Sequence, residues 1–225
     1  MLINGIVFDA DGTLLDSMRI WRNLGVEFLL SNGIQPEEKL SEKLYVMSFE
    51  QGIEYLKKNY ALKYSSEEIK NGILEIISDF YINKVQLKPN VKIFLEKIIS
   101  ELKIPMVIAT AGDRNLLESA LLRLGINDCF KKIFTCTELN TTKHEPKIFL
   151  ECAKFMFSKP ENILVFEDAF FALDTAKKAG FLIAGVEDDS SISSRERIKN
   201  ISDFYIEKFD FEEFKNFLFN LKGIN

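Results

Sequence analysis

The stretch IVFDADGTLLDS, residues Ile6 to Ser17, joins an apolar run to two aspartates, a glycine and a threonine. The apolar run predicts a buried strand, so Asp9 and Asp11 come directly after its end. Burying one carboxylate is unfavourable, and burying two close together is more so unless a cation lies between them. The stretch therefore indicates a central strand that ends in a cation-dependent chemical site.

The composition limits the class of protein. The 225 residues, 47% of them hydrophobic, can bury a full core and fit one large domain or one domain with an insert. The net charge is −5 and lysines are intermixed with glutamates, which argues against a sequence-independent grip on nucleic acid. No window approaches the roughly 20 apolar residues of a membrane span, and residues 1–5 do not begin a signal sequence. We therefore expect a cytoplasmic monomer or weak homodimer with no nucleic-acid or membrane partner. Cys129, Cys136 and Cys152 lack C-x-x-C spacing and are expected to be reduced core residues.

Short apolar runs bounded by turn residues recur along the chain, with helical patterns between them. Runs of this kind are typical of strands in a parallel sheet that is covered on both faces. Asp113 can cap a helix that Gly125 ends, and Gly180 ends the helix after Asp168. The alternation predicts an α/β fold with a Rossmann-like, doubly wound parallel sheet. The predicted strands are 5–9, 105–110, 132–135, 162–168, 181–186 and, more weakly, 204–206.

One interval interrupts this alternation. Residues 16–88 contain no strand-like run but four helical stretches, at 18–31, 36–46, 49–59 and 66–84. Within them, Ser48 with Gln51, and Ser65 with Glu68, have the spacing of a capping box. The sequence therefore predicts a core of residues 1–15 and 89–225, and an inserted all-helical domain of residues 16–88. Residues 209–221 predict a terminal amphipathic helix packed on the core.

Polar side chains gather where the predicted strands end, which is where open parallel sheets bind ligands. Asp9 and Asp11 follow the first strand, Thr110 ends the second, and Glu167 and Asp168 end the fourth. Four carboxylates from two neighbouring strands would repel one another unless a hard cation lay among them. Ligands that are all oxygen favour magnesium over zinc. The sequence therefore predicts a Mg²⁺ site with all four carboxylates as ligands.

A cation beside Asp9 favours nucleophilic attack at phosphorus, because it offsets the repulsion between two anions. Asp11 can then protonate the leaving oxygen and later activate water. Thr110 offers a hydroxyl in the loop TAGD, and Lys143, in TTKHEPKIF, offers a positive charge, so both are candidate phosphate-binding residues. Taken alone, Lys143 could equally be a solvated loop lysine. His144 is the only histidine, which leaves no basis for a Ser-His or multi-histidine scheme.

The segment DADGTLLDS, residues 9–17, resembles the first motif of the haloacid dehalogenase-like hydrolase superfamily, in which the first Asp is the nucleophile and the second the acid/base. VIATAGD, residues 107–113, is similar to the second motif, with Thr110. KHEPKIF, residues 143–149, resembles the third, with Lys143 as the phosphate-binding lysine, and VFEDAFFALDTAKKAG, residues 165–180, is similar to the acidic fourth. The resemblance implies that the insert is the cap of the subgroup containing β-phosphoglucomutase and phosphoglycolate phosphatase.

The chain departs from the family pattern in a few places. His144 and Lys147 stand where the third motif usually has Pro and Asp, and Ala169 and Ala172 where the fourth often has Ser and Gly. None of these changes removes an ionisable group that the scheme requires. The Gly-Arg element that mutase caps often carry is absent, and LYVMSFEQGIEYL, residues 44–56, occupies that region, so the sequence does not identify the substrate.

These observations predict a Mg²⁺-dependent phosphoric monoester hydrolase that acts on a small phosphorylated metabolite through a phospho-aspartate. The alternative within enzymes is a sugar-phosphate mutase, which returns the phosphoryl group to a bound intermediate and must exclude water. Dehalogenation is disfavoured, because Asp11 would have no leaving oxygen to protonate. A non-catalytic binding protein on the same fold is a further alternative, against which the intact set of acids argues.

Overall fold

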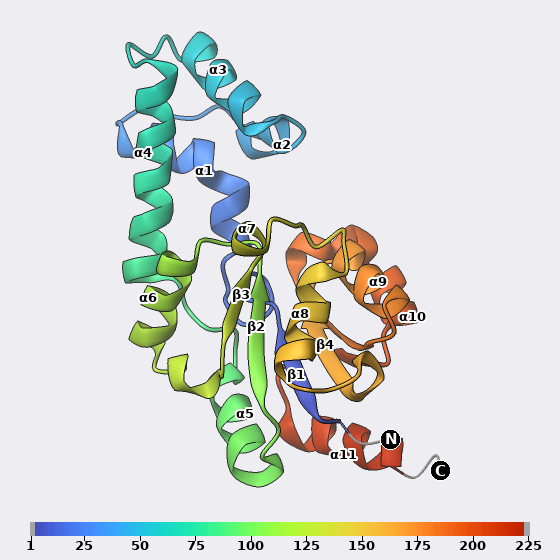
Figure 1. The fold of residues 1–225 in the computed structure, drawn as a ribbon. Coiled ribbons are helices and arrows are strands. Elements are labelled where there is room, and N and C mark those ends of the chain that lie inside the picture. The colour runs from blue at the N-terminus through green and yellow to red at the C-terminus, as the bar shows by residue number, and fades with distance from the viewer. Residues whose placement is uncertain (1–2, 223–225) are drawn as a thin grey trace. The chain divides into compact units, whose positions relative to one another are not determined.

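The computed structural model describes residues 3–222 and divides the chain into two compact units (Figure 1). The core comprises Met1–Asp16 and Gln86–Asn225, and the helical insert comprises Ser17–Val85. These boundaries lie one and three residues inside the predicted insert. The reason is backbone pairing: the N–H of Asp16 donates to the carbonyl of Gln86 at 2.9 Å, and Leu15 bridges Leu87. Both connecting segments therefore belong to the core.

The core is built on a six-stranded sheet in the order β3-β2-β1-β4-β5-β6, and every neighbouring pair is parallel. This confirms the predicted doubly wound α/β fold. β1 lies in the centre and pairs with β2 on one side and β4 on the other, so Phe8 is opposite both Ile108 and Phe166. The strands are β1 Gly5–Phe8, β2 Met106–Thr110, β3 Ile133–Thr135, β4 Ile163–Glu167, β5 Leu182–Val186 and β6 Phe204–Ile206.

Helices cover both faces of the sheet (Figure 1). Val7 and Val165 face the cluster made with α8, α9 and α10, whereas Phe8 and Phe166 face the rings of α5 and α11, where Phe94 lies 6.0 Å from Phe166. The alternation follows from the two-residue period of a strand. The core helices are α5 Val91–Lys97, α6 Arg114–Leu124, α7 Cys136–Leu139, α8 Lys147–Phe155, α9 Phe170–Lys178, α10 Arg195–Ile201 and α11 Phe211–Lys222, with a π-helical turn Ile98–Leu102 and 3₁₀ turns Asn127–Cys129, Pro160–Asn162 and Asp189–Ser194.

The insert is helical throughout its regular structure. Its helices are α1 Met18–Ser31, α2 Leu40–Tyr45, α3 Phe49–Asn59 and α4 Ser66–Asp79, which continues as a π-helical turn Phe80–Lys84. Both predicted capping boxes are confirmed: Ser48 is the N-cap residue of α3, and Ser65 is that of α4. The second helix starts later than the predicted residue 36, because Lys39 has a left-handed φ of 60° that no continuing helix tolerates.

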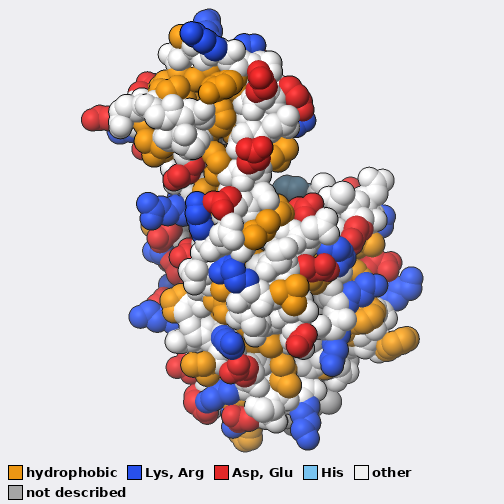
Figure 2. Space-filling view, turned by 90° about the vertical axis from the view of Figure 1, so that its left-hand side faces the viewer, with side chains coloured by type: hydrophobic (Ala, Val, Ile, Leu, Met, Phe, Trp, Pro, Cys, Tyr) orange, Lys and Arg blue, Asp and Glu red, His pale blue; other side chains and the backbone are white. Residues whose placement is uncertain are grey.

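Acidic and basic side chains are interspersed over the face of the core seen in Figure 2, whereas apolar side chains gather on the insert. The most exposed large apolar side chains of the insert include Tyr45, the last residue of α2, and Val46, which follows it. In residues 3–222 no helix is both long and apolar enough to cross a membrane. Cys136 and Cys152 are buried and Cys129 is half-buried, and all three are free thiols.

Candidate active site

The two central strands bring the predicted acids together. Asp9 follows β1 directly, and its N–H donates to the carbonyl of Phe166 in β4 at 2.9 Å. Glu167 is the last residue of β4, and Asp168 follows it. Since Phe8 is in register with Phe166, the residues after each strand lie next to one another at the carboxyl edge of the sheet. Strand pairing therefore places these carboxylates without any contribution from a flexible loop.

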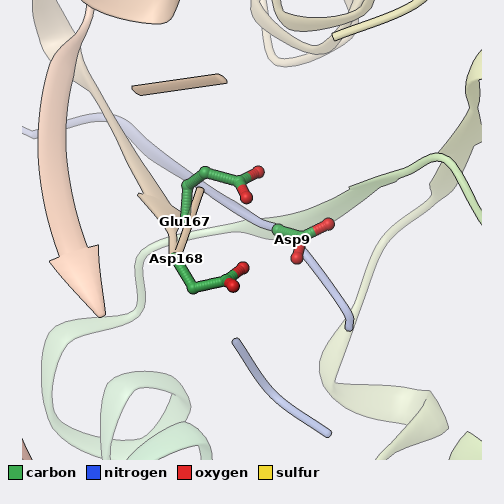
Figure 3. Close-up of side chains that lie close together, drawn as sticks. All are labelled: Asp9, Glu167 and Asp168. Carbon is green, nitrogen blue, oxygen red and sulfur yellow. The ribbon is translucent and has the colours of Figure 1, made fainter. Parts of the chain in front are cut away.

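Asp9, Glu167 and Asp168 form a buried trio (Figure 3). One carboxylate oxygen of each lies within 4.8 Å of the others, and all three side chains point toward a common space. Carboxylate oxygens are hard ligands that suit Mg²⁺, and the structure offers no nitrogen or sulfur ligand in this group. The donor set therefore fits the predicted cation.

Lys143 lies among these acids on the segment between α7 and α8. Its ammonium donates to Asp9 Oδ1 and, at 2.7 Å, to Glu167 Oε2. Burial by itself lowers the pKa of this lysine, but the two carboxylates outweigh burial and hold the pKa above its ordinary value. Lys143 is therefore a charged, buried residue of the site and not a solvated loop lysine.

The carboxylates of the trio are short of positive charge. Burial, followed by repulsion from Asp9, raises the pKa of Glu167 from 4.5 to about 7. Burial, followed by repulsion from Glu167 and Asp9, holds the pKa of Asp168 well above its ordinary value. Three carboxylates and the one ammonium of Lys143 leave a formal charge of −2 when all are ionised. A divalent cation would neutralise that charge.

Asp11, the fourth predicted ligand, is not part of the trio. The chain turns sharply after it, because Gly12 has a φ of 82° that favours glycine. A Cβ placed on Gly112 would lie 3.2 Å from Asp11 Oδ2 and 3.3 Å from Thr110 Oγ1. The Asp11 carboxylate and the Thr110 hydroxyl thus lie beside the same glycine.

Thr110 ends β2, next to β1, and is buried. Its Oγ1 accepts a hydrogen bond from the N–H of Gly112 at 2.9 Å, which fixes the hydroxyl and leaves its own hydrogen to donate. Asp113 then caps α6 by accepting from the N–H of Leu116 at 3.1 Å, as the sequence predicts. Thr110 is therefore a rigidly held donor at the same edge of the sheet as the trio.

The departures from the family pattern lie at the margin of this site. His144 is exposed, and its ring stacks on Phe171 with centroids 4.3 Å apart. Lys147 donates from its ammonium to the carbonyl of Leu139 at 2.6 Å. Both residues therefore pack locally, and neither changes the ionisable groups of the trio.

Sequence reasoning assigned no role to two hydroxyls that contact Asp168. Thr13 Oγ1 donates to Asp168 Oδ1, and Ser190 Oγ donates to Asp168 Oδ2, each at 3.4 Å. Thr13 lies inside the first motif, where it could have been found. Ser190 lies in DDSSISS, a run of small polar residues with no distinguishing pattern, and only the fold brings it to Asp168.

The model of one protein family, haloacid dehalogenase-like hydrolase, matches residues 6–186. This range contains the trio, Lys143 and Thr110. The chain belongs to the haloacid dehalogenase-like hydrolase family. The predicted resemblance is confirmed.

Several known proteins match most of the chain. This chain is 24% identical to the bifunctional riboflavin kinase/FMN phosphatase of Arabidopsis thaliana over 98% of its own length, but it spans only 59% of that protein. It is 24% identical to the phosphorylated carbohydrates phosphatase of Thermotoga maritima, over 79% of this chain and 82% of the relative. The crystal structure of β-phosphoglucomutase from Clostridium difficile matches with a TM-score of 0.66 at 21% identity, over 99% of this chain and 100% of that one. This last likeness supports the fold.

Proposed function

We propose that this protein is a Mg²⁺-dependent phosphatase that acts on small phosphorylated metabolites, with phosphorylated carbohydrates as the first class to test. The observation that carries the proposal is the buried trio of carboxylates with Lys143 in contact with Asp9. A buried group of acids with a net negative charge and a fixed lysine suits the binding of a cation together with a phosphate.

In this proposal Asp9, Glu167 and Asp168 hold Mg²⁺, and Asp11 remains a candidate fourth ligand. When bound, the cation lowers the repulsion between the nucleophile and the phosphate. Asp9 attacks phosphorus, which forms a bond from its carboxylate oxygen to phosphorus and breaks the bond to the leaving oxygen. Asp11 donates a proton to that leaving oxygen. In the second step Asp11 takes a proton from water, which attacks phosphorus and frees Asp9 and inorganic phosphate.

Lys143 and Thr110 bind the remaining phosphate oxygens in the proposed mechanism. The lysine contributes a full positive charge, and the threonine contributes a hydroxyl whose orientation Gly112 fixes. Donors fixed in advance stabilise the charge that spreads over these oxygens in the transition state. We propose that the helical insert is the cap that selects the substrate.

The substrate class rests on the relatives, two of which are phosphatases named for FMN and for phosphorylated carbohydrates. A mutase is the second candidate, because the β-phosphoglucomutase of Bacillus subtilis matches at 24% identity over 82% of this chain. The two differ in the fate of the phosphoryl group. A phosphatase transfers it to water, whereas a mutase turns over a bisphosphate intermediate.

The test is release of inorganic phosphate from a panel of sugar phosphates and FMN, with Mg²⁺ or with EDTA, by the wild type and by Asp9→Asn. We expect Mg²⁺-dependent release by the wild type and none above background by the variant. Release that persists in EDTA would contradict the role of the cation. Conversion of a hexose 1-phosphate to the 6-phosphate, dependent on added bisphosphate, would favour the mutase.

A further inference from the structure

Lys88 is a half-buried lysine that the proposed mechanism does not use. Its side chain is only 12% exposed, and its ammonium lies 2.8 Å from Asp188 Oδ2 and 2.6 Å from the carbonyl oxygen of Glu187. Lys88 stands where the chain returns to the core after the insert, and its two acceptors begin the segment after β5. One side chain thus joins parts of the core that are 99 residues apart in sequence.

The backbone of Lys88 holds a second segment. Its N–H donates to the carbonyl of Leu14 at 2.9 Å, and the preceding residue, Leu87, bridges Leu15. Leu14 directly follows Thr13 in the first motif. Lys88 therefore connects the turn after β1 to the segment after β5.

Each of these two segments carries a residue whose hydroxyl contacts Asp168. Thr13 donates to one carboxylate oxygen and Ser190 to the other, both at 3.4 Å. Ser190 is itself fixed, because its N–H donates to Asp188 Oδ1 at 2.8 Å. The contacts form a continuous path from the Lys88 ammonium through Asp188 and Ser190 to the carboxylate of Asp168.

We propose that Lys88 is a positioning residue for the divalent cation: it holds Asp188, and through Ser190 it fixes the orientation in which Asp168 presents its oxygens. The inference rests on the proposed function, since it needs a cation at the trio. Hydrogen bonds from outside the ligand set orient ligating carboxylates, and loss of such a partner typically weakens metal binding by about 10-fold to 100-fold.

A purely electrostatic role for Lys88 predicts the opposite result. Removing a positive charge near three carboxylates increases the attraction for a cation, so Lys88→Met would tighten binding. Positioning predicts weaker binding, because Asp188 and Ser190 lose their fixed place and the carboxylate of Asp168 keeps only the hydroxyl of Thr13 of these two partners. The sign of the change in affinity separates the two roles.

The experiment is a titration of the metal-free, full-length protein with Mn²⁺, followed by electron paramagnetic resonance. Mn²⁺ shares the preference of Mg²⁺ for oxygen ligands and is visible by this method. We expect Lys88→Met to weaken binding by about 10-fold, and Ser190→Ala to weaken it by a smaller factor. The matched control is Lys215→Met, which removes an exposed lysine paired with Glu101 at 2.9 Å and should leave the affinity unchanged.

The double variant Lys88→Met/Ser190→Ala tests the path itself. Because both residues act through the same hydroxyl, the double variant should bind little more weakly than Lys88→Met alone. Additive losses would overturn the proposed path, and unchanged or tighter binding by a folded Lys88→Met would overturn the positioning role.

Loss of Lys88 leaves the buried Asp188 without its ammonium, so the single variant can fail to fold. In that case the double variant Lys88→Met/Asp188→Asn, which removes both charges, replaces Lys88→Met in the titration, with the same expected loss of Mn²⁺ affinity. Ser190→Ala changes no charge and is measured in either case. If the wild type binds no Mn²⁺ and yet releases phosphate from its substrate, the cation dependence in the proposed function is wrong. If the wild type binds and the variants bind equally well, only the inference about Lys88 fails.

Discussion

Replacing Lys143 by methionine should destabilise the metal-free core and make its stability depend on Mg²⁺. The Lys143 side chain is 7% exposed, and its ammonium contacts Asp9 and lies 2.7 Å from Glu167 Oε2, so its loss leaves three converging carboxylates with no cation. Removing one partner of a buried ion pair typically costs about 3–5 kcal/mol. For a chain of this size, about 1 kcal/mol lowers the melting temperature by roughly 2–4 °C. We therefore expect a decrease of about 6–20 °C in EDTA.

Differential scanning calorimetry in EDTA is the appropriate assay. Tryptophan fluorescence would report on the wrong unit, because the single tryptophan, Trp21, lies in the insert. The control is Lys215→Met, whose pair with Glu101 is exposed and should contribute less than about 1 kcal/mol. Since the pKa of Lys143 lies above its ordinary value, the ammonium is charged at neutral pH, and the stability that its charge contributes is lost as the pH rises above about 10.

Two further conditions sharpen this test. Saturating Mg²⁺ at 100 times its dissociation constant should restore about 2.7 kcal/mol, because it binds the folded state only. Lowering the pH to 5 should also reduce the deficit, since Glu167 and Asp168 then accept protons and repel each other less. A variant that melts within about 2 °C of the wild type in EDTA at pH 8 would refute the assignment of Lys143 as the counter-charge of the trio.

Three other outcomes follow from the structure. Asp9→Asn should lower kcat by at least about 10³-fold with an unchanged circular dichroism spectrum, and substantial residual turnover would argue against a covalent intermediate. Because burial raises the pKa of Glu167 from 4.5 to about 7, the metal-free wild type should lose stability relative to Glu167→Gln as the pH rises through that window; a flat difference in unfolding free energy would contradict the shift. Gly185→Ala should lower the free energy of unfolding by about 1–3 kcal/mol, because a Cβ there would lie 2.6 Å from Ile198. The control Gly52→Ala, where the nearest neighbour of the Cβ would lie at 3.8 Å, should not destabilise the protein. Equal melting temperatures of Gly185→Ala and the wild type would show that Ile198 moves aside.

Much of the core could be predicted because its signals are local. Each strand is a short apolar run between turn residues, and both capping boxes lie within four residues of sequence. Asp9 and Glu167 were found by the same logic, since a strand end is visible in the sequence and its position at the sheet edge is fixed by topology. The start of α2 was missed, because nothing in the sequence marks Lys39 as left-handed.

The contacts around Asp168 could not be predicted, for a physical reason. Lys88 and Asp188 meet only after the strands are ordered, and neither carries a periodic pattern that points to the other. The same holds for Ser190, which is one of several small polar residues in its segment. A single sequence indicates candidate residues for the chemistry through local patterns, whereas the groups that contact them depend on long-range contacts.

The central place of β1 has a consequence for how the protein is made. Proteins are synthesised from the N-terminus, so Gly5–Phe8 leaves the ribosome before the other strands of the sheet. Its partners, β2 and β4, are made only after the whole helical insert, whose own contacts are close in sequence and can form in the meantime. Until β2 and β4 have been synthesised, an apolar strand with two unpaired edges is prone to bind other chains. The strand that leads into Asp9 is thus synthesised before both of its neighbours, and it cannot be fully paired until β4, which ends at Glu167, has emerged.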